Sequence, residues 1–198
     1  MRCTAFGVLF LISSASLGNA QQASKVTITE PGSATLDSYM KKADIVALVK
    51  VIAGDSEAYG VPIYKAQVRE NFKGTSVGQT IFFGRFVGTR LGWEYLLFLR
   101  NAANPISPKS SANPSFGPVR YAEVFNEGYS SMETSYECIF GAEKECDYGI
   151  RVCTDYVILP TNTPVSPPMT ETTDFGCRWV RRKTMLSLLA EQPSSQQP

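Results

Sequence analysis

The sequence predicts a mainly β protein whose core is a small antiparallel barrel, with one helix before the strands and one after them. Four segments between residues 45 and 99 have the β-branched or alternating pattern of strands, with no helical pattern between them. The apolar spacing typical of a helix is found only near the two ends of the chain. An apolar share of 43% can fill the core of one domain in a chain of 198 residues.

Residues 1–20 have the pattern of a secretory signal peptide. Arg2 is the only charged residue among them, residues 5–12 are apolar, and small residues lead up to Ala20. We therefore expect cleavage after Ala20 and a secreted or periplasmic product. A retained N-terminal anchor is the alternative, but the apolar run is too short for a membrane span, which needs about 20 residues.

The remaining chain is expected to form one domain and a short tail. Residues 21–191 carry the strand and helix patterns, whereas residues 192–198 contain only glutamine, proline and serine and are expected to be disordered. None of the later segments has an apolar run long enough for a stable membrane span.

Charge and composition exclude several classes of function. The chain has 19 basic and 18 acidic residues, and removal of Arg2 with the signal peptide would leave 18 of each. This balance gives no electrostatic reason to expect a nucleic-acid partner. The sequence contains no histidine, which excludes Ser-His-Asp and Cys-His catalysis and the HExxH zinc site. We therefore expect no catalytic residues, no cofactor and no metal.

The cysteines that follow the signal pattern are even in number, which in an exported chain indicates disulfides. They are Cys138, Cys146, Cys153 and Cys177. Three pairings are possible, and a hairpin over residues 130–159 with its turn near Gly141 favours Cys138–Cys146 and Cys153–Cys177. A four-thiolate zinc site is the alternative, but the intervals of 7, 6 and 23 residues include no CxxC pair.

The first half of the chain predicts one helix and then strands. A helix is expected over residues 36–43, where apolar residues follow the helical spacing and Ser33 or Thr35 can cap the first turn. Residues 45–52 are almost continuously apolar, as in a strand that is buried on both faces. Further strands are expected at 63–72, 80–87 and 93–99.

The second half of the chain is expected to alternate loops with strands. Residues 101–118 are rich in proline, asparagine and serine, and they predict a long exposed loop. Strands are expected within 119–140 and 148–159, and another loop at 160–174. A final helix is expected at about 177–191.

Two short motifs match catalytic signatures. Ser38 and Lys41 match SxxK, in which one helical turn brings a lysine close to a nucleophilic serine. The partner motifs of that catalytic fold are absent from the sequence, so a polar helix surface is the expected role. The run from Gly74 to Gly78 matches GxSxG, but it joins two expected strands in a chain without histidine, which favours a hairpin turn.

A basic cluster is expected on the surface of the final helix. Its members are Arg178, Arg181, Arg182 and Lys183. Such a cluster can bind an acidic surface or a phosphate. The alternative is a solvated helix face that has no partner.

Three short pieces of sequence follow one another in a suggestive order. Residues 43–46 (Ala-Asp-Ile-Val) open a strand after a helix, residues 68–81 give a strand, a Lys-Gly turn and a strand, and residues 92–98 read Gly-Trp-Glu-Tyr-Leu-Leu-Phe. In this order, behind a signal pattern, they resemble the exported barrels of the netrin-module and tissue-inhibitor-of-metalloproteinases superfamily. The resemblance implies a small OB-like antiparallel barrel.

The inhibitors of that superfamily chelate the protease zinc through the amine and carbonyl of an N-terminal cysteine. The expected mature chain begins at Gln21, and its first cysteine is Cys138. The resemblance therefore implies the fold but not this inhibitory route.

The sequence thus favours a non-catalytic binding or protein-interaction module whose partner is an extracytoplasmic protein or ligand. We expect loop 101–118 and the hairpin at 138–153 to make the contacts. One alternative is an inhibitor of an exported protease by a route other than zinc chelation. The other is a hydrolase that uses Ser38 and Lys41.

Overall fold

The fold was analysed in a computed structural model, which describes residues 32–84, 88–109, 116–124, 131–135, 140, 147–166 and 176–191. The helices are α1 (Leu36–Lys42) and α2 (Arg182–Ala190). The strands are β1 (Ala34–Thr35), β2 (Ile45–Asp55), β3 (Ile63–Lys73), β4 (Thr80–Gly84), β5 (Glu94–Asn101), β6 (Ala122–Val124), β7 (Ser131–Glu133), β8 (Gly149–Cys153), β9 (Val157–Ile158) and β10 (Cys177–Arg181).

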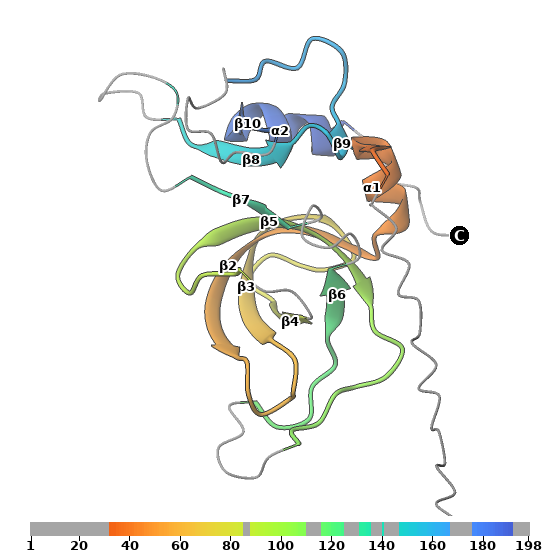
Figure 1. The fold of residues 1–198 in the computed structure, drawn as a ribbon, viewed down its shortest axis with the longest axis vertical. Helices are drawn as coiled ribbons and strands as arrows, with labels where there is room; N and C mark the ends of the chain where they lie inside the picture. The colour runs from red at the N-terminus through yellow and green to blue at the C-terminus, as the bar shows by residue number, and fades with distance from the viewer. Residues whose placement is uncertain are drawn as a thin grey trace, which may run out of the picture. The chain divides into compact units, whose positions relative to one another are not determined.

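The prediction of a mainly β protein with a small barrel is confirmed. Five strands form a closed barrel in the order β2-β3-β4-β6-β5, and pairing between β2 and β5 closes it (Figure 1). Neighbouring strands are antiparallel except β4 and β6, which are parallel. The barrel is therefore antiparallel with one parallel pair, which the sequence analysis did not anticipate.

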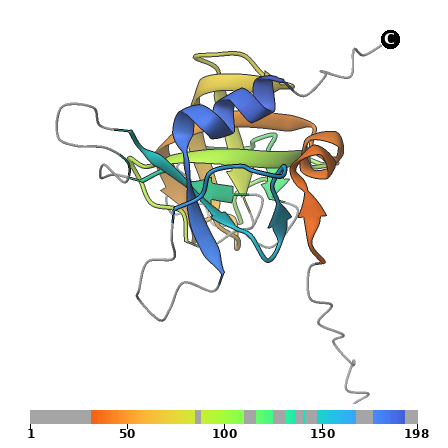
Figure 2. The ribbon, with the colours of Figure 1, turned by 90° about the horizontal axis from the view of Figure 1, so that it is seen from above.

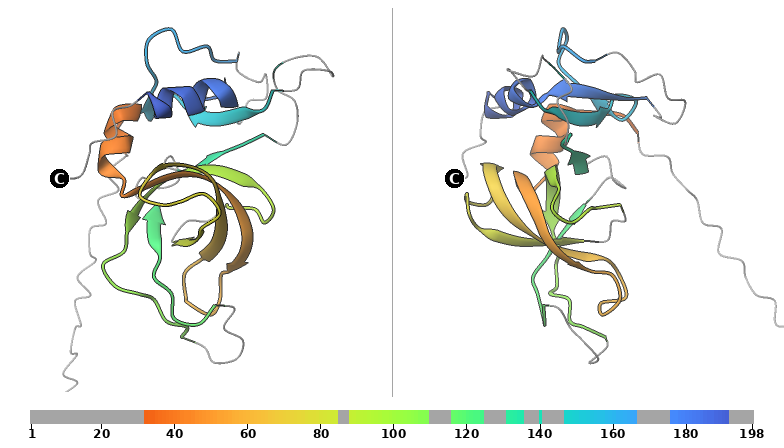
Figure 3. Two further views of the ribbon diagram at one scale, coloured as in Figure 1. Left: turned by 180° about the vertical axis from the view of Figure 1, so that it is seen from behind. Right: turned by 90° about the vertical axis from the view of Figure 1, so that its left-hand side faces the viewer.

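A second layer covers one outer side of the barrel. Strand β7 pairs with β5 beside β6, and an isolated bridge between Thr134 and Ile150 connects β7 to the two-stranded β8–β10 sheet. Helix α2 follows β10 directly, and the views in Figures 2 and 3 place α2, β8 and β10 over β5. Helix α1 lies at the edge of the same layer (Figure 1). We call β7–β10, α1 and α2 the covering layer.

Strands β2 and β5 are buried on both faces over residues 45–49 and 95–99, so the prediction for residues 45–52 holds except at Lys50, which is half-buried, and Ile52, which is 48% exposed. Their odd-numbered residues point into the barrel, where they form one cluster with residues of β3 and β4. Their even-numbered apolar residues point outward and belong to a different cluster, shared with the covering layer. The outward residues are Val46, Leu48, Leu96 and Phe98, and each has an exposed fraction of 0%.

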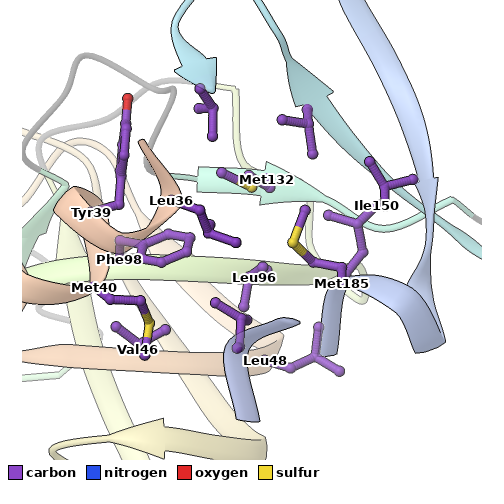
Figure 4. Packing of buried hydrophobic residues seen from close by; sticks show 14 of the residues in the cluster. Leu36, Tyr39, Met40, Val46, Leu48, Leu96, Phe98, Met132, Ile150 and Met185 are labelled. Carbon is purple, nitrogen blue, oxygen red and sulfur yellow. The ribbon is translucent and has the colours of Figure 1, made fainter. Parts of the chain in front are cut away.

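The covering layer contributes apolar side chains from segments that are far apart in the sequence. Figure 4 shows Met185 of α2 beside Ile150 of β8, with Met132 of β7 close to Leu96 on the outer face of β5. Leu36 and other residues of α1 pack from the far end of the cluster. Burial of this outer face therefore joins the C-terminal third of the chain to the barrel.

Helix α1 is capped at its first turn and attached to the barrel at its last turn. Thr35 caps the first turn, because its Oγ1 accepts the Ser38 N–H at 3.2 Å. At the other end, Lys73 Nζ donates to the carbonyls of Met40 at 3.0 Å and Ala43 at 2.6 Å. A cation at this end also matches the negative pole of the helix dipole. The Lys-Gly turn after β3 thereby holds the C-terminal end of α1.

Gly74, the second residue of that turn, has a φ of +72° and lies against the backbone carbonyl of Asp44. A side chain there would adopt a left-handed conformation and would also collide with this carbonyl. Only glycine fits this position, because β3 turns directly beside the start of β2.

The expectation of a helix over 177–191 is wrong for its first five residues. Residues 177–181 form β10, which pairs along its whole length with β8. Its burial does not follow the usual alternation of a strand, since Cys177 and Val180, three positions apart, are both buried. Pairing with β8 and cross-linking to it outweigh the helical pattern of the residues that follow.

The described residues of loop 101–118 are mostly exposed, as predicted, but Ile106 and Phe116 are half-buried and pack against a cluster that contains Tyr59. Ile106 and Val119 exchange backbone hydrogen bonds of 2.9 Å in each direction. Phe116 stacks on Tyr59, whose hydroxyl donates to the Gly117 carbonyl at 2.6 Å. Burial raises the pKa of Tyr59, and the nearby Asp55 carboxylate adds to this rise. The apolar residues among the prolines fold back onto the barrel because they have a cluster to join.

The favoured pairing Cys153–Cys177 is confirmed, and the disulfide links the facing ends of β8 and β10. Cys138 and Cys146 lie outside the described residues, as do residues 1–31, which include the signal pattern, and the tail 192–198. Among the described residues, neither helix has the length and apolar character that crossing a bilayer requires.

The apolar contact between α2 and the barrel can be measured with Met185→Ala. Met185 is fully buried, so its truncation should lower the free energy of unfolding by about 2–5 kcal/mol through lost burial and a residual cavity. Urea unfolding followed by circular dichroism provides the measurement. Ser187→Ala on the exposed side of α2 is the control and should change stability by less than about 0.5 kcal/mol. Equal effects of the two substitutions would show that α2 does not pack on the barrel.

The attachment of α1 can be measured with Lys73→Met. This change keeps most of the aliphatic stem but removes the donor to the helix carbonyls, and we expect a loss of about 1–3 kcal/mol in unfolding free energy. Lys42→Met on the exposed side of α1 is the matched control. A Lys73→Met protein as stable as this control would contradict the proposed attachment.

Candidate functional site

A pocket with a volume of about 320 Å³ lies between the outer side of the barrel and the start of α2. The barrel contributes Lys50, Glu94 and Gly92 to its lining. The covering layer contributes Thr134 and Ser135 after β7, Tyr148 before β8, and Arg182 at the start of α2. This volume is at the lower end of the range for small-molecule sites in proteins, which is about 300–1,000 Å³.

The barrel side of the pocket continues the outward faces of β2 and β5. Lys50 follows Val46 and Leu48 on the outward side of β2, and it is directly paired with Glu94 of β5. The outward face is therefore apolar where the covering layer packs on it, and it becomes charged where the pocket begins. The pairing register of β2 and β5 therefore fixes the positions of Lys50 and Glu94, and neither residue lies in a loop.

Backbone hydrogen bonds hold the other side of the pocket in place. The Thr134 N–H donates to the Glu94 carbonyl at 2.9 Å, which fixes the end of β7 to β5. The Ser135 N–H donates to the Gly149 carbonyl at 2.8 Å, and Ser135 Oγ accepts the Gly149 N–H at the same distance. Three separate segments of the chain thus meet around the pocket on a fixed backbone.

Arg182 connects the covering layer to two strands of the barrel. Its Nη1 lies 3.2 Å from the Glu94 carboxylate on β5, and its Nη2 lies 3.3 Å from Glu70 on β3. Its backbone N–H donates to the carbonyl of Tyr148 at 2.9 Å. The guanidinium therefore reaches across β2 and fixes the first residue of α2 above the outward face of the barrel.

Two groups of the pocket lack a protein partner among the described residues. The side-chain ammonium of Lys50 makes no ion pair or hydrogen bond in that part of the chain. The Thr134 hydroxyl oxygen is buried and has no hydrogen-bond partner there either. A polar group that is buried without a partner is costly, and such groups concentrate at functional sites. The pocket is therefore polar, preformed and incompletely satisfied.

The predicted basic cluster is not on one helix. Arg178 and Arg181 belong to β10, so only Arg182 and Lys183 are in α2. Arg181 lies over the ring of Phe140 at 4.8 Å and forms an ion pair of 3.3 Å with Asp147. Since Arg181 and Arg182 have acidic partners, the structure does not support a shared cationic surface made by all four residues.

The SxxK motif does not have the geometry of an activated serine. Lys41 Nζ lies 2.7 Å from the Asp37 carboxylate, one helical turn earlier, and both side chains are exposed. A lysine that activates a serine must direct its amine at the hydroxyl. The ion pair with Asp37 directs the Lys41 amine toward this carboxylate instead of Ser38.

The GxSxG motif forms the turn between β3 and β4, as expected. Gly74 and Gly78 both have a positive φ, which hairpin turns commonly require. The Ser76 N–H donates to the side-chain oxygen of Gln79 at 3.1 Å, and Thr75 Oγ1 lies 2.8 Å from the same oxygen. Local turn contacts account for the motif.

The expected contact loop 101–118 has a pocket of its own. Residues 102–106 line a hollow of about 300 Å³ together with Tyr121 and Glu123. The Tyr121 hydroxyl donates to the Glu123 carboxylate at 2.8 Å, so these two groups satisfy one another. Only Phe140 and residues 147–153 of the expected contact hairpin at 138–153 are described. Phe140 and Asp147 exchange backbone hydrogen bonds, as the two arms of a hairpin do.

Sequence reasoning did not identify the pocket. It named Arg182 as a surface cation, and it assigned no role to Lys50, Glu94, Thr134 or Tyr148. A signal was present: Lys50 is the one charged residue in the apolar run 45–52, and Glu94 is a charged residue at the start of the apolar strand that pairs with it. Two charges in two apolar strands mark a place where the covering of the barrel ends.

Comparisons with known proteins give no assignment for this site. The chain matches no family model, no curated protein and no solved structure. The case for a function therefore rests on the pocket itself.

Proposed function

We propose that this chain is an exported, non-catalytic binding module and that its ligand occupies the pocket around Lys50 and Thr134. The observation that carries the proposal is a preformed polar pocket in which an ammonium group and a buried hydroxyl have no partner among the described residues. Bound ligands supply the missing contacts of such groups.

The arrangement of the barrel supports the OB-like part of the proposal. A closed Greek-key barrel of five strands is the architecture of the OB fold. Here the first barrel strand, β2, pairs with both β3 and β5, and β4 pairs with β6 in parallel. The residues that resemble the netrin-module superfamily lie in β2, β3, β4 and β5, which are four strands of this barrel. Proteins of this architecture commonly bind ligands at loops and exposed strand faces.

The contacts in the pocket favour binding over catalysis. Ser135 has a hydroxyl group, but its oxygen accepts the N–H of Gly149 and helps to fix the backbone. The carboxylate of Glu94 is paired with Arg182 and lies beside the paired strand position of Lys50. A general base or nucleophile needs a partner that activates it, and these groups instead position one another.

Export is proposed from the pattern of residues 1–20 and is supported by the Cys153–Cys177 disulfide, since disulfides persist in oxidising compartments.

Export predicts a new N-terminus at Gln21. The full chain, expressed in a secretory host, should be recovered outside the cytoplasm, and mass spectrometry should find Gln21 as its first residue. Leu9→Asp places a charge in the apolar run and should leave the chain uncleaved inside the cell, whereas Ser14→Thr should not affect processing. Release of a wild-type chain that still carries residues 1–20 would refute export by this route. The absence of any released chain would refute it as well.

Binding in the pocket can be tested without knowledge of the natural ligand. A library of small polar fragments, screened by ¹H–¹⁵N NMR, should shift the backbone amides of Gly92, Thr134 and Ser135 more than those of residues 102–106. Tyr148→Ala removes an exposed aromatic wall and should weaken the hits about 3- to 10-fold. Ile158→Ala, an exposed apolar residue that does not line the pocket, is the control. Hits spread evenly over the surface would contradict the proposed site.

A further inference from the structure

We propose that the ligand of this pocket carries a carboxylate group and that Lys50 is its counter-ion. This inference rests on the proposed binding function and adds the chemical class of the ligand: a small organic monoanion with an apolar or aromatic body.

The lining has one cation without an ion pair among the described residues, although its charges balance once Glu70, the second partner of Arg182, is counted. It contains two cations, Lys50 and Arg182, and one carboxylate, Glu94. Arg182 shares its guanidinium between Glu94 and Glu70, so the acidic groups nearby are already engaged with it. Lys50 has no acidic partner among the described residues apart from its strand neighbour Glu94, with which it forms no ion pair. The charge left for a ligand is therefore that of the Lys50 ammonium.

The same charges favour a single negative charge over a double one. A monoanion would neutralise Lys50, whereas the second charge of a phosphate dianion would face the Glu94 carboxylate on the neighbouring strand. A carboxylate also has two acceptor oxygens. One can accept from Lys50, and the other is available to a hydroxyl donor in the wall.

Thr134 is the wall residue that can supply such a donor. Thr134 is 4% exposed, and its hydroxyl lacks a hydrogen-bond partner among the described residues. Its backbone N–H donates to the Glu94 carbonyl. A 120° rotation about the Cα–Cβ bond moves the hydroxyl of a threonine to another staggered position, which the methyl group or the hydrogen occupied before. Rotation of Thr134 can thus turn an unsatisfied hydroxyl toward a ligand without any movement of the backbone.

The rest of the lining determines the size and character of the ligand body. The volume of about 320 Å³ suits a small molecule, not a long chain. Tyr148 is 40% exposed and presents an aromatic ring at the pocket. A ring or short aliphatic group can pack against this face while the carboxylate reaches Lys50. Benzoate is a simple probe that has both features.

The test compares benzoate with benzamide, which has nearly the same shape but no charge. We expect benzoate to bind the folded protein with a dissociation constant in the millimolar range and benzamide to bind at least 10-fold more weakly. Phenyl phosphate should bind no more tightly than benzoate. Shifts of the Gly92, Thr134 and Ser135 amides report binding at the pocket.

Lys50→Met should weaken benzoate at least 10-fold and leave benzamide unchanged, whereas Lys65→Met on β3, outside the pocket, should affect neither. Thr134→Val should weaken benzoate about threefold. Salt provides a test without mutation, since raising the salt concentration from about 20 to 500 mM should weaken benzoate and not benzamide.

Three outcomes would overturn the inference. Equal affinities for benzoate and benzamide at the pocket would remove the charge preference and leave the proposed binding site standing. Unchanged benzoate affinity in a folded Lys50→Met protein would remove Lys50 as the counter-ion. If no fragment of any charge shifts the pocket amides, the proposed binding function fails together with this inference.

Discussion

The two-sided burial of β2 and β5 is the constraint on which the rest of the structure depends. A barrel strand normally presents its inward residues to the core and its outward residues to water. Here the outward residues Val46, Leu48, Leu96 and Phe98 are as apolar as the inward ones and are fully buried. A barrel with such a face would be insoluble alone. The C-terminal third of the chain, together with α1, supplies the necessary cover.

The cover is assembled from short pieces, and each needs a specific attachment. The disulfide joins β8 to β10, Lys73 holds the end of α1, and Arg182 fixes the start of α2 to two barrel strands. The same attachment by Arg182 defines the edge of the pocket. Where the apolar face ends, Lys50 and Glu94 occupy the outward positions. The covering layer does not pack on these two residues, and a pocket lies above them. The candidate site is thus a consequence of how the barrel is covered.

Much of the barrel could be predicted from sequence because its patterns are local. The continuous apolar run 45–52 indicated burial on both faces, and the Lys-Gly turn and its flanking strands were identified from alternation and glycine. The pairing Cys153–Cys177 followed from the expected hairpin. The parallel pair β4–β6 and the strand at 177–181 could not be predicted, since both depend on partners far away in the sequence. A local pattern indicates the periodicity of a segment, but it does not identify the strand that pairs with this segment.

The pocket was missed for the same reason. Its lining comes from β2, the start of β5, the end of β7, the start of β8 and the start of α2, and apart from β7 and β8 these elements are not consecutive in the sequence. Lys50 alone is one lysine in a strand, and Thr134 alone is one threonine in a polar stretch. Only the register of β2 against β5, and the bond from Thr134 to Glu94, bring them to one place.

The central claim, that the C-terminal layer covers the outward face of β2 and β5, can be tested most directly by methyl NMR. With methyl-labelled Met, Leu, Ile and Val, the account predicts nuclear Overhauser effects that connect Met185 and Ile150 to methyl groups of Leu48 or Leu96. The methyl groups of Leu48 and Leu96 should also be shielded from a soluble paramagnetic agent. Absence of these cross-peaks, together with strong paramagnetic broadening of the Leu48 and Leu96 methyl signals, would contradict it.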